Sequence, residues 1–147
     1  MSCVGGYVTA QPAHLSHRAR EGDTMNTFAV WFGRLVWLGI IANFGLAIPG
    51  LFWPEPVLAF FGFPPASPPL WPRFACLLLI LLSLFYMPGA INLFHYRANA
   101  YLAVFSRFAG FVFFLAGPST YYLLGLFDLA FAIPQAILLL LALRTAK

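Results

Sequence analysis

Residues 98–144 read ANAYLAVFSRFAGFVFFLAGPSTYYLLGLFDLAFAIPQAILLLLALR, and they predict the fold class more clearly than any other part of the chain. It holds two apolar runs, 98–117 and 121–144. Each can cross a hydrocarbon layer about 30 Å thick, which takes roughly 20 residues. Only Pro118, Ser119 and Thr120 separate the runs, and so short a turn makes two helices antiparallel neighbours. The stretch therefore predicts a transmembrane helical hairpin.

Two similar runs precede it, at 27–51 and 72–93. We expect the Pro49-Gly50 pair to end the first and Pro88-Gly89 to kink the second, while Pro134 lies inside the last run. Membrane helices tolerate such prolines where neighbours satisfy the freed carbonyl groups. The predicted fold is all-α, an integral membrane bundle of four transmembrane helices.

Composition agrees with this class. The 147 residues are 62% hydrophobic and only 8% charged, and the mean hydropathy is +0.86. A soluble domain carries about 25% charged residues, so this chain cannot build a water-facing shell. A soluble enzyme, a disordered protein and a free nucleic-acid binder are excluded, and the expected partner is a lipid bilayer.

The parts outside the four runs differ in character. Residues 1–24 are polar, and we expect a disordered, uncleaved cytoplasmic leader before a transmembrane domain at 25–147. Residues 52–71 contain six prolines and several aromatic residues. Here we expect an outer loop with a short interfacial helix at 55–61, flanked by Trp53 and Trp71.

Cations predict the orientation through the positive-inside rule. The opposite side of the membrane carries Arg73, whereas the termini and the second connection carry Arg18, Arg20, Arg97, Arg144 and Lys147. We therefore expect a multi-pass protein of the bacterial inner (cytoplasmic) membrane with both termini cytoplasmic, N-in/C-in.

Three ionisable residues fall within the runs: Arg34, Arg107 and Asp128. Each costs at least about 2.5 kcal/mol at mid-bilayer, so each should face the bundle interior and have a partner. At about 1.5 Å of rise per residue, Arg107 and Asp128 lie at similar depths below the 118–120 turn. Both share a helix face with small residues suited to close packing. We predict an ion pair between Arg107 and Asp128.

Two buried arginines would face one buried acid, and this excess leaves three hypotheses open. In the first, the ions only lock helix packing and Arg34 snorkels toward the inner headgroups. In the second, Arg34, Arg107, Gln135 and Tyr121 bind an anion or carbonyl group within the bundle, such as a quinone head, a fatty-acid carboxylate or a lipid phosphate. In the third, Asp128 relays protons, which the adjacent Arg107 disfavours.

Other candidate residues are few. His95, at the cytoplasmic end of the second run, is either a membrane-surface anchor or one axial ligand of a haem- or chlorophyll-type pigment. Cys3 and Cys76 indicate neither a disulfide framework nor a metal pair. The sequence contains no zinc spacing, nucleophile elbow, phosphate loop or dinucleotide motif. We predict no catalytic residue, no metal site and no certain cofactor, with a quinone or lipid as the open alternative.

The chain resembles the DoxX-like group of small four-helix bacterial membrane proteins. The resemblance covers about residues 27–143 and is carried by Phe32-Gly33-Arg34-Leu35, Trp53-Pro54-Glu55-Pro56, Phe60-Phe61-Gly62-Phe63-Pro64, Arg107 and Gly125-Leu126-Phe127-Asp128. Named members of that group look like small subunits of quinone-linked oxidoreductases or partners of redox-stress complexes. The resemblance implies an architectural or quinone-proximal role for Arg34, Arg107 and Asp128.

Three functions are therefore open. The preferred one is an accessory or assembly subunit of a larger membrane complex, including a redox complex, with a lipid or quinone pocket. The alternatives are a small subunit of a quinone-linked oxidoreductase and a small transporter or channel. An enzyme acting on its own is not favoured, because no catalytic cysteine pair is present.

Overall fold

A computed structural model describes the backbone of residues 13–146 and the side chains of residues 27–146. Its helices are α1 (Ala13–Phe52), α2 (Pro54–Phe60), α3 (Leu70–Ile91), α4 (Arg97–Leu115), η1 (Ser119–Tyr121) and α5 (Tyr122–Thr145). Within this part of the chain, four segments are long and apolar enough to cross a membrane: Thr27–Phe52, Leu70–Ile91, Arg97–Leu115 and Ser119–Thr145. The all-helical class and the four spans are therefore as expected, with limits that differ by only a few residues.

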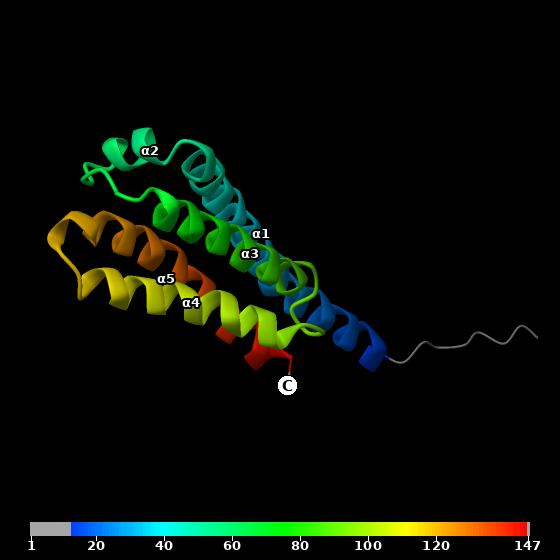
Figure 1. Cartoon of the computed structure of the whole chain (residues 1–147). Helices are drawn as coiled ribbons and strands as arrows, with labels where there is room; N and C mark the ends of the chain where they lie inside the picture. Colours follow the sequence, from blue (N-terminus) through cyan, green and yellow to red (C-terminus); the bar gives the residue numbers. More distant parts are fainter. Residues whose placement is uncertain (1–12, 147) are drawn as a thin grey trace, which may run out of the picture.

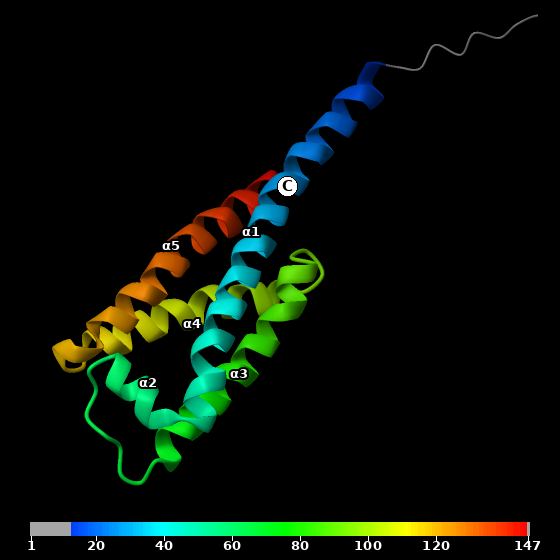
Figure 2. The same ribbon diagram turned by 90° about the horizontal axis from the view of Figure 1, so that it is seen from above.

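The long helices form a four-helix bundle in which α1 packs against α3 and α5, and α4 packs against α5 and α3. Consecutive spans are antiparallel. One end of the bundle therefore holds the α3–α4 connection and the end of α5, and α1 projects beyond it (Figures 1 and 2). The opposite end holds α2 and the α4–α5 turn. This arrangement brings the middle parts of the four spans to about the same level.

Small residues allow the helices to approach closely. A Cβ atom on Gly33 of α1 would lie 2.5 Å from the carbonyl oxygen of Ala90 in α3. A Cβ on Gly89 would lie 2.8 Å from the backbone nitrogen of Ala100 in α4. Next to these contacts lies a compact apolar core, formed by Phe32, Val36, Ile40, Tyr86, Leu93, Ala100, Ala103, Leu139 and Ala142.

Helix α1 differs from its expected limits at both ends. It begins at Ala13, so residues 13–24 are helical where we expected a disordered leader, and residues 1–12 lie outside the described part. Adding residues to an existing helix costs far less than nucleating one, and this segment contains good helix formers. Pro49-Gly50 does not end α1, which continues to Phe52. Gly50 instead packs against Cys76 of α3, where a Cβ would lie 2.6 Å from the sulfur.

The proline-rich connection covers one end of the bundle. It contains α2, one residue earlier than the expected helix at 55–61. The ring of Phe63 lies 4.7 Å from that of Tyr121, which ties the connection to the α4–α5 turn. The large aromatic residues around α2 are exposed, as in an aromatic belt at a membrane interface: Phe52, Trp53, Phe60 and Trp71.

Candidate functional site

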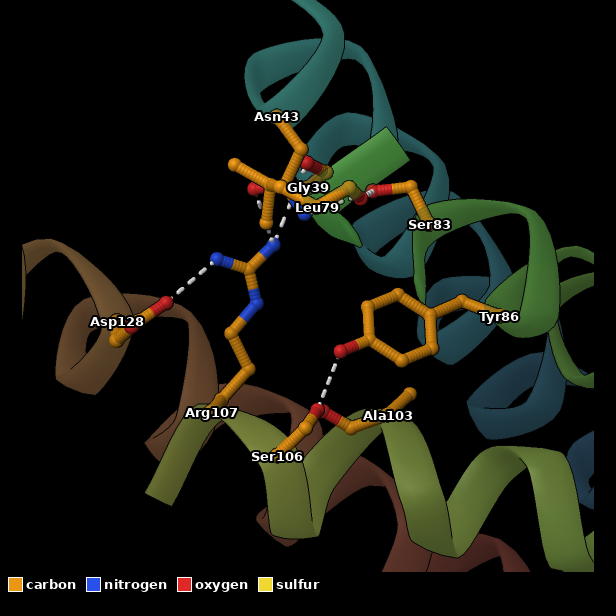
Figure 3. A network of polar contacts seen from close by, with 9 residues as sticks. All are labelled: Gly39, Asn43, Leu79, Ser83, Tyr86, Ala103, Ser106, Arg107 and Asp128. Carbon is orange, nitrogen blue, oxygen red and sulfur yellow. Dashed lines mark hydrogen bonds and ion pairs between the residues drawn. The ribbon is translucent and has the colours of Figure 1, made fainter. Parts of the chain in front are cut away.

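Arg107 of α4 lies in the bundle interior with 4% of its surface exposed. Its Nη1 atom donates a hydrogen bond to Oδ1 of Asp128 in α5 at 2.8 Å. The two residues thus form the ion pair expected from the sequence (Figure 3). Their charges cancel, which removes the need for a charged ligand at Arg107.

The second terminal nitrogen of Arg107 reaches α1. Its Nη2 atom donates to Oδ1 of Asn43 at 3.1 Å and to the carbonyl oxygen of Gly39 at 3.3 Å. Asn43 in turn donates through Nδ2 to the hydroxyl of Ser83 in α3 at 2.9 Å. These contacts, with Asp128, make up what we call the Arg107 network (Figure 3), and it joins α1, α3, α4 and α5.

Two local features accommodate the arginine side chain: space beside Gly39 and aromatic rings of α5 next to the guanidinium. A Cβ at Gly39 would lie 2.9 Å from Nη2 of Arg107, so a side chain there would displace the guanidinium. The guanidinium also lies against aromatic rings of α5, 5.0 Å from the centre of Phe131 and 5.9 Å from that of Phe127. The aromatic faces attract the cation where water is excluded.

A second polar contact joins α3 and α4 beside the Arg107 network. The hydroxyl groups of Tyr86 and Ser106 are hydrogen-bonded to each other, and either can be the donor. When the Ser106 hydroxyl donates its one proton to the carbonyl oxygen of Ala103, 3.2 Å away, Tyr86 is the donor to Ser106. Tyr86 is therefore a core residue whose polar end is satisfied.

Gln135 of α5 borders the same region. It is 2% exposed, and its Nε2 atom would lie 3.6 Å from a Cβ on Gly39. Its Oε1 atom is buried and has no hydrogen-bond partner among the described side chains and backbone. The structure thus brings Gln135 near Arg107, as the binding hypothesis requires.

The other two residues of that hypothesis lie elsewhere. The ring of Tyr121 packs against Phe63 and Phe114 at the end of the bundle that holds α2. Arg34 is exposed on the outer face of α1, and its guanidinium lies 5.1 Å from the centre of the Trp31 ring. Arg34, Arg107, Gln135 and Tyr121 therefore do not converge on one internal site.

The expectation that Arg34 faces the bundle interior is wrong. Successive helical residues are about 100° apart, so Arg34 lies opposite its neighbours Phe32 and Val36. Those two side chains are 0% and 2% exposed and fix the inward face of α1. The exposed position agrees with the alternative in which Arg34 snorkels toward a membrane surface.

His95 is exposed in the connection between α3 and α4. Its backbone N–H donates to Oδ1 of Asn92 at 3.0 Å, and its ring meets Tyr96 edge-on with the ring centres 4.6 Å apart. The described residues contain no group of three or more His, Cys, Asp or Glu side chains placed to hold a metal ion. The axial-ligand hypothesis therefore depends on a cofactor at the bundle surface.

Sequence reasoning missed Asn43 and Ser83, which connect α1 and α3 to Arg107. The sequence alone does not mark Asn43 as inward-facing, because the first run is apolar on all sides. In the structure the buried residues of α1 form one face of the helix, and Asn43 belongs to it: Phe32, Gly33, Val36, Gly39, Ile40, Asn43, Ala47 and Gly50. A polar residue in such an inward series needs a buried hydrogen-bond partner.

Hollows occur on the outside of α4. A shallow apolar groove of about 550 Å³ is lined by Ala98, Tyr101, Leu102, Val104, Phe105 and Phe108. A smaller hollow of about 90 Å³ lies between α4 and α5, beside Gly125. The groove is open and apolar, which suits a lipid tail, an isoprenoid chain or a partner helix.

Comparisons of the chain with protein-family models, with curated proteins and with solved structures find no match.

Proposed function

We propose that this protein is an accessory or assembly subunit of a larger complex in the bacterial inner membrane. The observation that carries the proposal is the Arg107 network. Arg107 and Asp128 neutralise each other, and the remaining guanidinium nitrogen bonds Asn43 and Gly39. These groups hold four helices in a fixed arrangement, which is what a scaffold subunit needs.

The orientation in this proposal has both termini in the cytoplasm. Arg97 at the start of α4 and Arg144 in the last turn of α5 are exposed at the same end of the bundle. At the opposite end Arg73 and Glu55 are both exposed, and their charges sum to zero. The positive-inside rule favours the cytoplasm for the first end.

A partner would dock sideways, within the membrane. The connections between α3, α4 and α5 are short, whereas the groove on α4 is an open apolar surface. In this proposal a helix of the partner lies along Tyr101, Phe105 and Phe108.

The same groove favours a second candidate, a small subunit of a quinone-linked oxidoreductase. An isoprenoid tail or quinone ring would contact the aromatic side chains of the groove. This candidate is also the one that the DoxX-like resemblance implies. It moves the proposed quinone from the bundle interior to the outer face of α4. A transporter has less support, because the interior polar groups bond one another across the helices.

Purification of the native protein in a mild detergent or in nanodiscs tests these functions. Mass spectrometry would identify what accompanies it, and an absorption spectrum would reveal a pigment or quinone. We expect one protein in a fixed ratio to the chain. Phe105→Ala should weaken that association, whereas Phe85→Ala, an equally apolar exposed position on α3, serves as the control. A chain accompanied only by bulk lipid would contradict the proposal.

A further inference from the structure

Arg34 lies on the exposed face of α1, inside the span Thr27–Phe52. Its exposed neighbours on α1 are large and apolar: Val30, Trp31, Trp37, Leu38 and Ile41. A charged group among such residues is costly unless it reaches a polar partner or the membrane surface. The described side chains give Arg34 no carboxylate partner, because the ion pair they contain joins Arg107 and Asp128.

The side chain of Arg34 runs toward the N-terminal end of the span. Its guanidinium lies 5.1 Å from the centre of the Trp31 ring, and Trp31 is about 4.5 Å nearer that end along the helix axis. The span has 26 residues and is thus about 39 Å long, against about 30 Å of hydrocarbon. If the span is centred, the Arg34 Cα lies roughly 6 Å inside the hydrocarbon. From there the guanidinium is directed toward the end of the span at which a membrane surface would lie.

The charges at this end of the bundle favour an anionic occupant. Among the side chains of residues 27–146, Arg97 and Arg144 are exposed there, while Glu55 is exposed at the opposite end beside α2. Clustered cations near a membrane surface attract anionic lipids. We propose that Arg34 and Trp31 form a binding site for the phosphate of an anionic phospholipid, in the leaflet at the N-terminal end of the α1 span.

The geometry suits a phosphate. The Arg34 guanidinium lies over the Trp31 ring, and its N–H groups can donate to two oxygens of one phosphate. The acyl chains would lie along the apolar residues beyond Arg34 on the same face, Trp37, Leu38 and Ile41. This site does not depend on the function proposed above, because it is formed by one helix and lipid alone.

The full chain in detergent would be titrated with phosphatidylglycerol and with phosphatidylcholine, and native mass spectrometry would count bound lipids. We expect the wild type to prefer phosphatidylglycerol about fivefold, and Arg34→Gln to bring the ratio close to one. Trp31→Leu should give an intermediate ratio. Arg73→Gln is the matched control, since Arg73 is an exposed arginine at the opposite end. It should leave the ratio unchanged.

Several results would overturn the proposal. An unchanged ratio in Arg34→Gln would do so, and loss of a co-purified protein in that variant would then assign Arg34 to a partner's carboxylate. An equal fall of this ratio in Arg73→Gln would show that the preference depends only on the net charge of the protein. Displacement of the lipid by excess glycerol phosphate would identify a site for free phosphate. In the wild type, raised salt should lower the preference, and this measurement needs no variant.

Discussion

Asn43 of α1 and Arg107 of α4 are joined by a hydrogen bond of 3.1 Å across 64 positions of sequence. The bond is buried, and it connects the first helical hairpin of the bundle to the second. The other terminal nitrogen of Arg107 donates to Asp128, so the one arginine bonds both Asn43 of α1 and Asp128 of α5. Stability should therefore depend on these residues as a group rather than one by one.

Asp128→Asn should destabilise the protein. The change leaves the Arg107 guanidinium with an uncompensated charge in the bundle, and we expect a loss of about 2 kcal/mol, as for a hydrogen bond to a charged group. Thermal unfolding in detergent measures it. The double variant Arg107→Leu with Asp128→Leu should partly restore stability, because it removes both charges. A single variant as stable as the wild type would show that the ion pair is not needed for packing.

Asn43→Leu should also destabilise, by about 1–3 kcal/mol. Arg107 Nη2 would keep only the Gly39 carbonyl oxygen, and the Ser83 hydroxyl would lose the amide that donates to it. The sharper test is a double-mutant cycle with Arg107→Leu. We expect the Asn43 change to cost less in the Arg107→Leu background. Strictly additive effects would mean that the two residues act independently.

Gln135→Met, unlike the changes above, should not lower the stability of the protein. Gln135 is as deeply buried as Asn43, but its Oε1 atom lacks a partner in the described structure. Removing an unsatisfied polar group in favour of an apolar one of similar shape is neutral or stabilising. We therefore expect an unchanged or higher melting temperature. A clear fall would indicate that Oε1 is satisfied in the membrane, and a bound ligand would then be sought by mass spectrometry.

Gly33→Ala should lower stability by about 1–3 kcal/mol through overpacking, since the new methyl group would meet the Ala90 carbonyl oxygen. Gly45→Ala is the matched control in the same helix. A Cβ there meets nothing within 4 Å, so alanine should be neutral or add up to about 1 kcal/mol through helix propensity. Equal melting temperatures for the two variants would refute the close contact between α1 and α3.

The orientation predicts a labelling pattern. In a chain without its native cysteines, Ser119→Cys at the α4–α5 turn should react with an impermeant maleimide in intact cells. Lys147→Cys should react only after lysis, because the positive-inside rule assigns the C-terminus to the cytoplasm. The reverse pattern would invert the topology and leave the bundle itself unaffected.

The sequence was most informative about contacts between helices that a short turn connects. Three residues separate the last two runs, so the depths of Arg107 and Asp128 followed from helix rise alone, and the pair is present in the structure. The outward face of Arg34 could not be derived in the same way. The first run is apolar all round, so its periodicity does not define an inward side. That side is set by distant contacts, Gly33 with Ala90 and Asn43 with Arg107.

Helix α1 is continuous from Ala13 to Phe52, and 14 of its residues precede the span that begins at Thr27. At about 1.5 Å per residue, this extension reaches roughly 20 Å past the bundle (Figure 2). The close contact between this helix and α3 lies at Gly33, and the helical residues before it would move as one unit about that contact. A molecule that bound the extension and tilted it would also move Gly39 and Asn43, because they belong to the same continuous helix. The position of the extension is thus coupled, through one continuous helix, to the groups of Gly39 and Asn43 that accept hydrogen bonds from Arg107.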